Sequence, residues 1–234
     1  MSDSRAEVFR ALARARGRAS PVDNIREELE AIGLPPTPAM DADSALEAFL
    51  IRLTQAKATV EIAADRTQVV KSISNYLYRR HNSRRIVAGH DPRLAALPWR
   101  DGGVLVRFDA AEAEDTVSVS YAGLGVAESG SVLLYSDRGN PARNNWLVQE
   151  QIVVLDLDDL QENFEQAWLR IGADREAGIC PRAIHFISGP SSTGDIVGHL
   201  VVGAHGPLAL HVILRGHVEP QQQESLAQYL QLPY

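Results

Sequence analysis

Short apolar runs alternate with helical patterns along most of this chain, and this alternation restricts its fold more than any other feature. The strand-like runs are residues 59–63, 85–88, 104–106, 116–119, 130–135, 151–155, 183–187 and 209–214. Between the first two runs, Asp65 precedes apolar residues at helical spacing. Strands and helices that alternate every 10–20 residues or so, roughly as here, are typical of an α/β domain with a largely parallel sheet. We therefore expect an α/β fold.

One later segment, residues 156–171, predicts a further helix. Its apolar residues recur at helical spacing, and Asp156, Asp158 and Asp159 lie near its start. Acidic side chains are favourable at the positive end of a helix dipole. We interpret these acids as stabilising the helix and keeping it soluble, and not as metal ligands.

The first residues predict a separate helix over 4–16, with Val8, Phe9 and Leu12 near one face and arginines mostly elsewhere. The arginines are either a solvated basic face or a docking arm for an acidic partner. A further short helical run extends from residue 21 to residue 32.

Residues 33–38 read Gly-Leu-Pro-Pro-Thr-Pro and predict a linker, because proline lacks an N–H donor and fixes φ. From this we expect residues 1–56 to be a helical extension with linker and 57–216 to be the α/β domain. Residues 217–234 would then form a polar tail with one short helix from Ser225.

Composition excludes several classes of protein. The chain has 234 residues, and 30 acidic against 23 basic residues give a net charge of −7, which does not favour nucleic acid. The single cysteine, Cys180, allows neither an internal disulfide nor a four-thiolate iron–sulfur cluster within the chain. No run reaches the ~20 apolar residues of a membrane span, and the start lacks the apolar core of a signal peptide. We expect a cytoplasmic protein without a membrane span.

A segment that leaves the strand 183–187 has the composition of a ligand-binding turn. Glycine lets a ligand approach the backbone, and open N–H groups with hydroxyl donors form an anion site where a strand turns into a helix. A short helix is expected near Ser192. The candidate ligand-binding residues here are Ser188, Gly189, Ser191, Ser192, Thr193 and Asp195. The alternative is a capped loop without a ligand.

A second glycine-rich segment, residues 123–131, places Glu128 just before an apolar strand. A carboxylate in such a place can act as a base, a nucleophile or a hydrogen-bond acceptor. Glu128 is therefore a candidate catalytic residue, with Gly130 beside the ligand; the alternative is a structural carboxylate with a partner. We expect this corner and the Ser188–Thr193 corner to meet at one rim of the sheet and form a pocket.

Four histidines, at positions 199, 205, 211 and 217, recur every six residues. This period does not match the spacings of zinc sites, so no metal site is predicted. His205 lies in Gly-Ala-His-Gly-Pro, which forces a loop, and is the second candidate catalytic residue. His211 lies in an apolar strand and is expected to be a core histidine.

Two motifs resemble the LUD-domain family. One is Ala-Glu-Ser-Gly-Ser followed by an apolar strand at residues 127–134, and the other runs from 187 through Gly-Ala-His-Gly-Pro at 203–207 to 214. The resemblance implies a Rossmann-like open sheet of the NagB/RpiA/CoA transferase-like class, with helices on both faces. It also implies a role in oxidising L-lactate to pyruvate beside iron–sulfur oxidoreductase subunits. On this view the clusters belong to the partners, and no cofactor is expected on this chain.

Two positions depart from the family pattern. Val197 stands where the family usually has a glutamate, and Gln151 stands where a histidine is common. Three functions remain open. The chain is an accessory subunit that binds partner proteins and a small anionic ligand, or a stand-alone enzyme in which Glu128 acts on an acyl-CoA or sugar-phosphate-like molecule, or a non-catalytic interaction domain.

Overall fold

The computed structural model describes residues 3–15, 27–28, 30–33, 42–194 and 200–230, which divide into two compact units. Unit 1 covers Met1–Pro38 and unit 2 covers Ala39–Tyr234. In unit 1, helix α1 spans Asp3–Ala15, close to the predicted 4–16. Most of the helical run predicted for 21–32 lies outside the described residues.

The division between the units falls after Pro38, whereas the sequence suggested a domain that begins at residue 57. The difference arises from helix α3 (Ala45–Gln55), whose Phe49, Leu50 and Leu53 are fully buried in the core of unit 2. Helix α8 (Pro220–Leu226) begins at Pro220 and not at the predicted Ser225, and it likewise places Leu226 in that core. Both flanking segments therefore complete the hydrophobic core of the α/β domain.

A six-stranded parallel sheet forms the centre of unit 2 and confirms the predicted α/β class. In spatial order its strands are β1 (Thr59–Ala63), β12 (Ala209–Arg215), β7 (Glu150–Asp156), β4 (Val117–Tyr121), β2 (Arg85–Ala88) and β3 (Leu105–Phe108). In the register of the central strands, Ile152 lies between His211 and Val119. The middle strands are buried on both faces, which explains why they read as continuous apolar runs.

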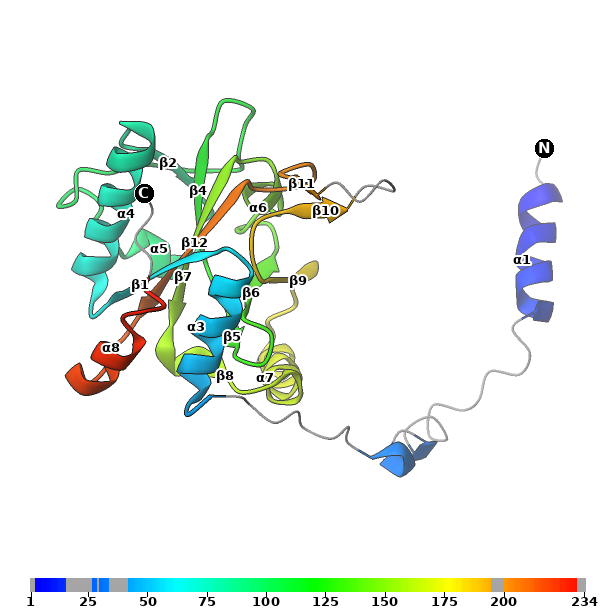
Figure 1. The fold of residues 1–234 in the computed structure, drawn as a ribbon. Coiled ribbons are helices and arrows are strands. Elements are labelled where there is room, and N and C mark those ends of the chain that lie inside the picture. The colour runs from blue at the N-terminus through cyan, green and yellow to red at the C-terminus, as the bar shows by residue number, and fades with distance from the viewer. Residues whose placement is uncertain (1–2, 16–26, 29, 34–41, 195–199, 231–234) are drawn as a thin grey trace. The chain divides into compact units, whose positions relative to one another are not determined.

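Helices cover both faces of this sheet, as expected (Figure 1). Helices α4 (Arg66–His81) and α5 (Pro92–Ala95) pack on one face, and α3 packs on the other. Helix α4 begins where the sequence predicts, because the Asp65 carboxylate accepts a hydrogen bond from the Gln68 N–H at 2.8 Å.

A second, smaller sheet lies on the α3 side, and the sequence did not reveal it as separate. Its strands, in spatial order, are β8 (Leu160–Gln161), β5 (Leu124–Val126), β6 (Ser131–Ser136) and β9 (Ala183–Ile187). Strand β6 pairs antiparallel with both β5 and β9. Helix α7 (Phe164–Glu176) packs on this sheet through Ala167 and Phe164.

The helix predicted over 156–171 is wrong in its first half. Residues 157–159 form a short 3-10 turn and residues 160–161 form β8, so that α7 begins only at Phe164. Asn163 is the N-cap, with its side chain accepting from the Gln166 N–H at 2.9 Å. The acids before it instead enter ion pairs, such as Asp156 with Arg215 and Asp159 with Arg170.

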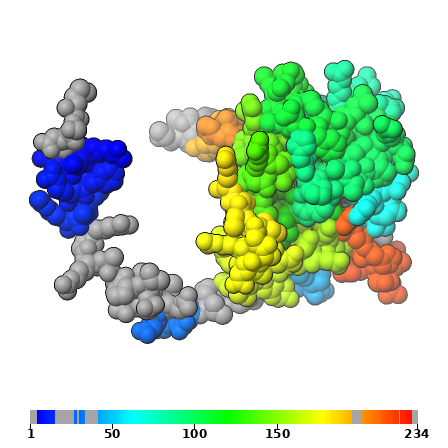
Figure 2. Space-filling model, turned by 180° about the vertical axis from the view of Figure 1, so that it is seen from behind, coloured from blue at the N-terminus to red at the C-terminus, as the bar shows by residue number. Residues whose placement is uncertain are grey.

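A short hairpin, β10 (Ser192–Gly194) with β11 (Leu200–Val202), stands out from the body of unit 2 (Figures 1 and 2). The short helix expected near Ser192 is therefore wrong, since this segment pairs as a strand. Within the described part of the chain, no helix is long and apolar enough to cross a bilayer.

Candidate functional site

Glu128 follows strand β5, and its contacts tie it to the start of helix α7. Its Oε2 accepts a hydrogen bond from the Phe164 N–H at 3.1 Å, and its own N–H donates to the Glu162 carbonyl at 3.0 Å. A carboxylate at a helix N-terminus satisfies a free N–H and favours the helix dipole. These contacts match the structural alternative considered for Glu128.

Residues of the two predicted corners meet, but in the smaller sheet and not at a rim of the central one, and the pocket expected between them is wrong because helix α3 fills that space. Antiparallel pairing of β6 with β9 sets Val132 opposite Ile187. One residue further on, the hydroxyls of Ser131 and Ser188 lie 2.7 Å apart, and Ser129 reaches Ser131 at the same distance. The resulting group, Glu128–Ser131 with Ser188–Gly189, is called here the closed corner.

The end of helix α3 fills the space beside the glycines of the closed corner. A Cβ on Gly130, whose φ is +65°, would lie 2.6 Å from Arg52 Cβ and 2.8 Å from the Leu53 nitrogen. A Cβ on Gly189 would lie 2.5 Å from the Ala56 carbonyl oxygen. These glycines therefore allow α3 to approach, and the space that a ligand was expected to use beside them holds protein.

A second group of predicted residues gathers around Ser191, and we call Ser191–Thr193 with Gly203–Pro207 the open corner. The Ser191 N–H donates to the Pro207 carbonyl at 2.9 Å, and the Gly203 N–H donates to the Ser191 carbonyl at 2.8 Å. The His205 N–H donates to Ser191 Oγ at 3.3 Å. His205, Ser192 and Thr193 are exposed, and the candidate Asp195 lies outside the described residues.

Helix α6 (Arg143–Trp146) packs against the open corner through Trp146. A Cβ on Gly206 would lie 3.4 Å from Trp146 Cε3, and the Trp146 ring meets the His185 ring edge-on at 5.3 Å. Burial lowers the pKa of His185, which favours a neutral ring.

Five large apolar side chains on α6, β11 and their adjoining loops are between 42 and 54% exposed, and we call them the hairpin surface: Trp146, Leu147, Val201, Val202 and Leu208. Leu208 closes over Gly203, and its N–H donates to the Gln149 carbonyl at 2.6 Å. Exposed apolar side chains that gather beside one loop are typical of surfaces that bind another protein.

Sequence reasoning missed a polar cluster where strands β2 and β4 end. Asn145 Oδ1 accepts from Ser120 Oγ at 3.1 Å and from Gln151 Nε2 at 2.9 Å. Gln151 is fully buried, and its Oε1 has no hydrogen-bond partner among the described residues. The small cavity beside this cluster is lined by Gly89, Ser120, Tyr121, Leu134, Tyr135, Asn140, Pro141, Asn144 and Asn145. The volume open to the centre of a water molecule is about 10 Å³, which is roughly what one buried water needs.

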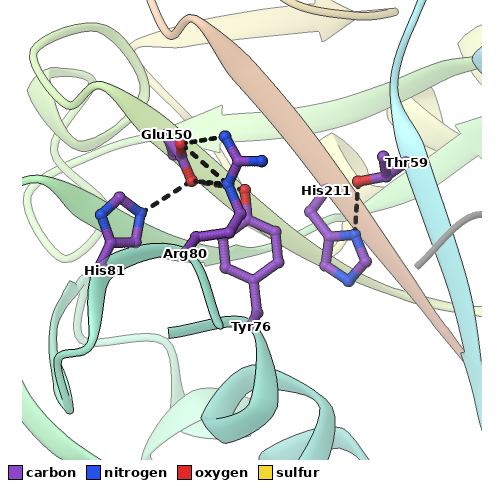
Figure 3. A network of polar contacts seen from close by, with 6 residues as sticks. All are labelled: Thr59, Tyr76, Arg80, His81, Glu150 and His211. Carbon is purple, nitrogen blue, oxygen red and sulfur yellow. Dashed lines mark hydrogen bonds and ion pairs between the residues drawn. The ribbon is translucent and has the colours of Figure 1, made fainter. Parts of the chain in front are cut away.

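A buried charge network surrounds Glu150, which begins strand β7 next to Gln151 (Figure 3). Glu150 accepts hydrogen bonds from Tyr76 at 2.7 Å and from Arg80 at 2.5–3.0 Å, and it contacts His81 at 2.9 Å. Burial alone would raise the pKa of Glu150, but these bonds outweigh it and lower the pKa to about 2. The network fixes α4 to the sheet.

His211 is a core histidine, as predicted. It is fully buried, its Nδ1 lies 2.8 Å from Thr59 Oγ1, and its ring packs 4.8 Å from that of Tyr76 (Figure 3). Its Nε2 lies 3.6 Å from Glu61 Oε2. Among the described residues, no three His, Cys, Asp or Glu side chains are grouped so that they could hold a metal ion.

Comparison with known proteins gives consistent matches. The LUD domain matches residues 106–214, which include both corners. Lactate utilization protein C of an Exiguobacterium species is 26% identical over 147 residues, which cover 59% of this chain and 64% of that protein. Lactate utilization protein C of Shouchella clausii is 37% identical over 101 residues, or 43% and 44% of the two chains. The matches thus span between about half and two thirds of these relatives' length.

A solved structure supports the fold. The crystal structure of a DUF162 family protein from Deinococcus radiodurans superposes with a TM-score of 0.54 at 20% sequence identity. It covers 74% of this chain and 96% of that one.

Proposed function

Because residues 106–214 match the LUD domain, we propose that this chain serves lactate utilization as an accessory subunit. In this proposal it binds iron–sulfur oxidoreductase proteins that convert L-lactate to pyruvate, and the clusters belong to those partners. The observation that carries the proposal is the match to proteins named lactate utilization protein C in several bacteria.

The contacts of Glu128 favour a subunit over a stand-alone enzyme that acts at the closed corner. A general base or nucleophile must reach a substrate. The Glu128 carboxylate is instead hydrogen-bonded to the start of α7, and α3 fills the space beside Gly130 and Gly189. A role in positioning α7 accounts for these contacts without a substrate.

The hairpin surface is the site that we assign to a partner protein. Protein interfaces are enriched in tryptophan and other large apolar side chains at their centre. Trp146 supplies such a side chain, and Val201 and Val202 add exposed apolar side chains on the two faces of the β10–β11 hairpin. The exposed Ser192 and Thr193 provide hydroxyls at its rim.

Small-molecule binding is the second candidate, and the polar cluster around Asn145 favours it. Ligands of open α/β sheets bind beyond the carboxyl ends of the strands, which is where the cavity beside Gly89 and Ser120 lies. The lining has amide and hydroxyl groups and no charged side chain. At this volume, the cavity has room for one water molecule.

The test is deletion of the gene followed by complementation in a host that grows on L-lactate. The wild-type chain should restore growth on L-lactate and co-purify with proteins that contain iron and acid-labile sulfide. The variant Val201→Ser/Val202→Ser should lose both, while the control variant Leu169→Ser, at an exposed apolar side chain of α7, should keep the iron–sulfur proteins. Oxidation of L-lactate by the purified chain alone, or normal growth of the deletion strain on L-lactate, would contradict the proposal.

A further inference from the structure

Helix α1 combines a narrow apolar stripe with a polar side that carries Arg10 and Arg14 together with Asp3 and Glu7. Val8, Phe9 and Leu12 are 57–58% exposed. At about 100° per residue, these three fall within an arc of roughly 100° on one side of the helix. Arg10 and Arg14 fall on the opposite side.

Charge separates this segment from the rest of the protein. Residues 1–19 contain five arginines and two acidic residues, a net charge of +3, whereas the whole chain carries −7. The acids are Asp3 and Glu7. A short basic stretch in an acidic chain is typical of a segment that binds an anionic partner.

One arginine, Arg5, lies on the same side of the helix as the apolar stripe. The Arg5 guanidinium is 5.6 Å from the centre of the Phe9 ring. Arginine can keep its charged group at a polar boundary while its stem covers apolar surface. Side chains arranged this way suit a helix that lies at the boundary between headgroups and acyl chains.

We propose that α1 binds the surface of an anionic lipid bilayer, with Phe9 and Leu12 in the acyl boundary and the arginines held by the negative surface potential. A helix of 13 residues is only marginally stable alone in water, so a surface that accepts its apolar stripe also stabilises it. Charge complementarity favours lipid, since a bilayer offers diffuse negative charge and needs no shaped groove. This inference is independent of the proposed role in lactate utilization.

The experiment is co-sedimentation of the full chain with vesicles of phosphatidylcholine alone and with vesicles that also contain phosphatidylglycerol. We expect binding to the second kind only, weakened by added salt. Phe9→Ser/Leu12→Ser should weaken it by roughly tenfold or more, because two large apolar side chains leave the lipid. Arg10→Gln/Arg14→Gln should also weaken it.

The control is Ala6→Ser, which lies away from the stripe and changes helix propensity in the same direction. Ala6→Ser should bind anionic vesicles as the wild type does, and all variants should have the same melting temperature. Absence of binding to anionic vesicles would overturn the proposal, and so would unchanged binding by Phe9→Ser/Leu12→Ser. If the chain does not bind vesicles and Phe9→Ser/Leu12→Ser instead loses a bound acidic protein, then α1 binds a protein and the lipid proposal fails.

Discussion

The closed and open corners contain the same kinds of residue and yet differ in what surrounds them. Gly130 and Gly189 are pressed against the end of α3, and Ser131 and Ser188 bond to each other. At the open corner, Ser191 Oγ accepts a hydrogen bond from the His205 backbone N–H. The His205 side chain and the residues of β10 are exposed. A Gly/Ser motif therefore allows helix packing at the closed corner and leaves side chains exposed at the open corner.

The largest effect is expected from Gly130→Ala in the closed corner. A left-handed backbone conformation costs a non-glycine residue about 1–2 kcal/mol, and overlap with α3 adds roughly 1–3 kcal/mol. Gly194→Ala is the matched change beside the open corner, where a Cβ meets nothing within 4 Å. Urea unfolding should show a loss of roughly 2–5 kcal/mol for the first and less than about 0.5 kcal/mol for the second. Equal losses would remove the distinction between the corners.

Acid should lower the free energy of unfolding of unit 2, because it protonates the buried Glu150. The folded-state pKa of Glu150, about 2, lies below its usual value of 4.5. A lowered pKa stabilises the fold above the usual value, and this contribution is lost as pH falls toward 2. The loss amounts to about 3 kcal/mol. Global unfolding followed between pH 5 and pH 2 should show it, and Glu150→Gln should flatten that pH dependence while lowering stability at neutral pH.

Glu128→Ala should cost about 1 kcal/mol, because the start of α7 loses a hydrogen-bond acceptor. Glu128→Gln keeps an acceptor oxygen and should cost less. Chemical unfolding measures both. If Glu128→Gln leaves stability unchanged and abolishes L-lactate-dependent growth, Glu128 has a chemical role and the structural interpretation is wrong.

The smallest change in stability is expected from His205→Ala. The side chain is exposed, and the hydrogen bond to Ser191 comes from the backbone. The free energy of unfolding should stay within about 0.5 kcal/mol of the wild type. A loss above that would show that the open corner is as tightly packed as the closed one.

Much of the fold could be predicted because the parallel sheet is buried on both faces. The segments 59–63, 85–88 and 209–214 were recognisable as apolar runs, and the Asp65 cap marked the start of α4. Strand β5 was not recognisable, since Gly125 interrupts its apolar residues; a Cβ there would lie 2.6 Å from Leu155 Cδ2 and 3.1 Å from Leu160 Cδ1. That contact depends on tertiary packing, which local patterns do not encode.

The sequence pointed to the residues of the two corners, but it did not point to Trp146, Leu147, Val201, Val202 or Leu208 of the hairpin surface. Pairing of β6 with β9 brings Ser131 to Ser188, as the two motifs suggested. The sequence held no sign that α3 occupies the adjoining space. Asn145 was missed because two asparagines before a strand are typical of an ordinary turn, and only the fold places their amides beside Gln151.

We propose that this chain contributes to lactate utilization through its hairpin surface and not through the Glu128 carboxylate. The most direct measurement is the rate of L-lactate oxidation in the complementation strain that carries either Glu128→Gln or Val201→Ser/Val202→Ser. We predict a rate near wild type for the glutamate variant and a severe loss for the hairpin variant. The reverse result, with oxidation abolished by Glu128→Gln and retained by Val201→Ser/Val202→Ser, would contradict this account.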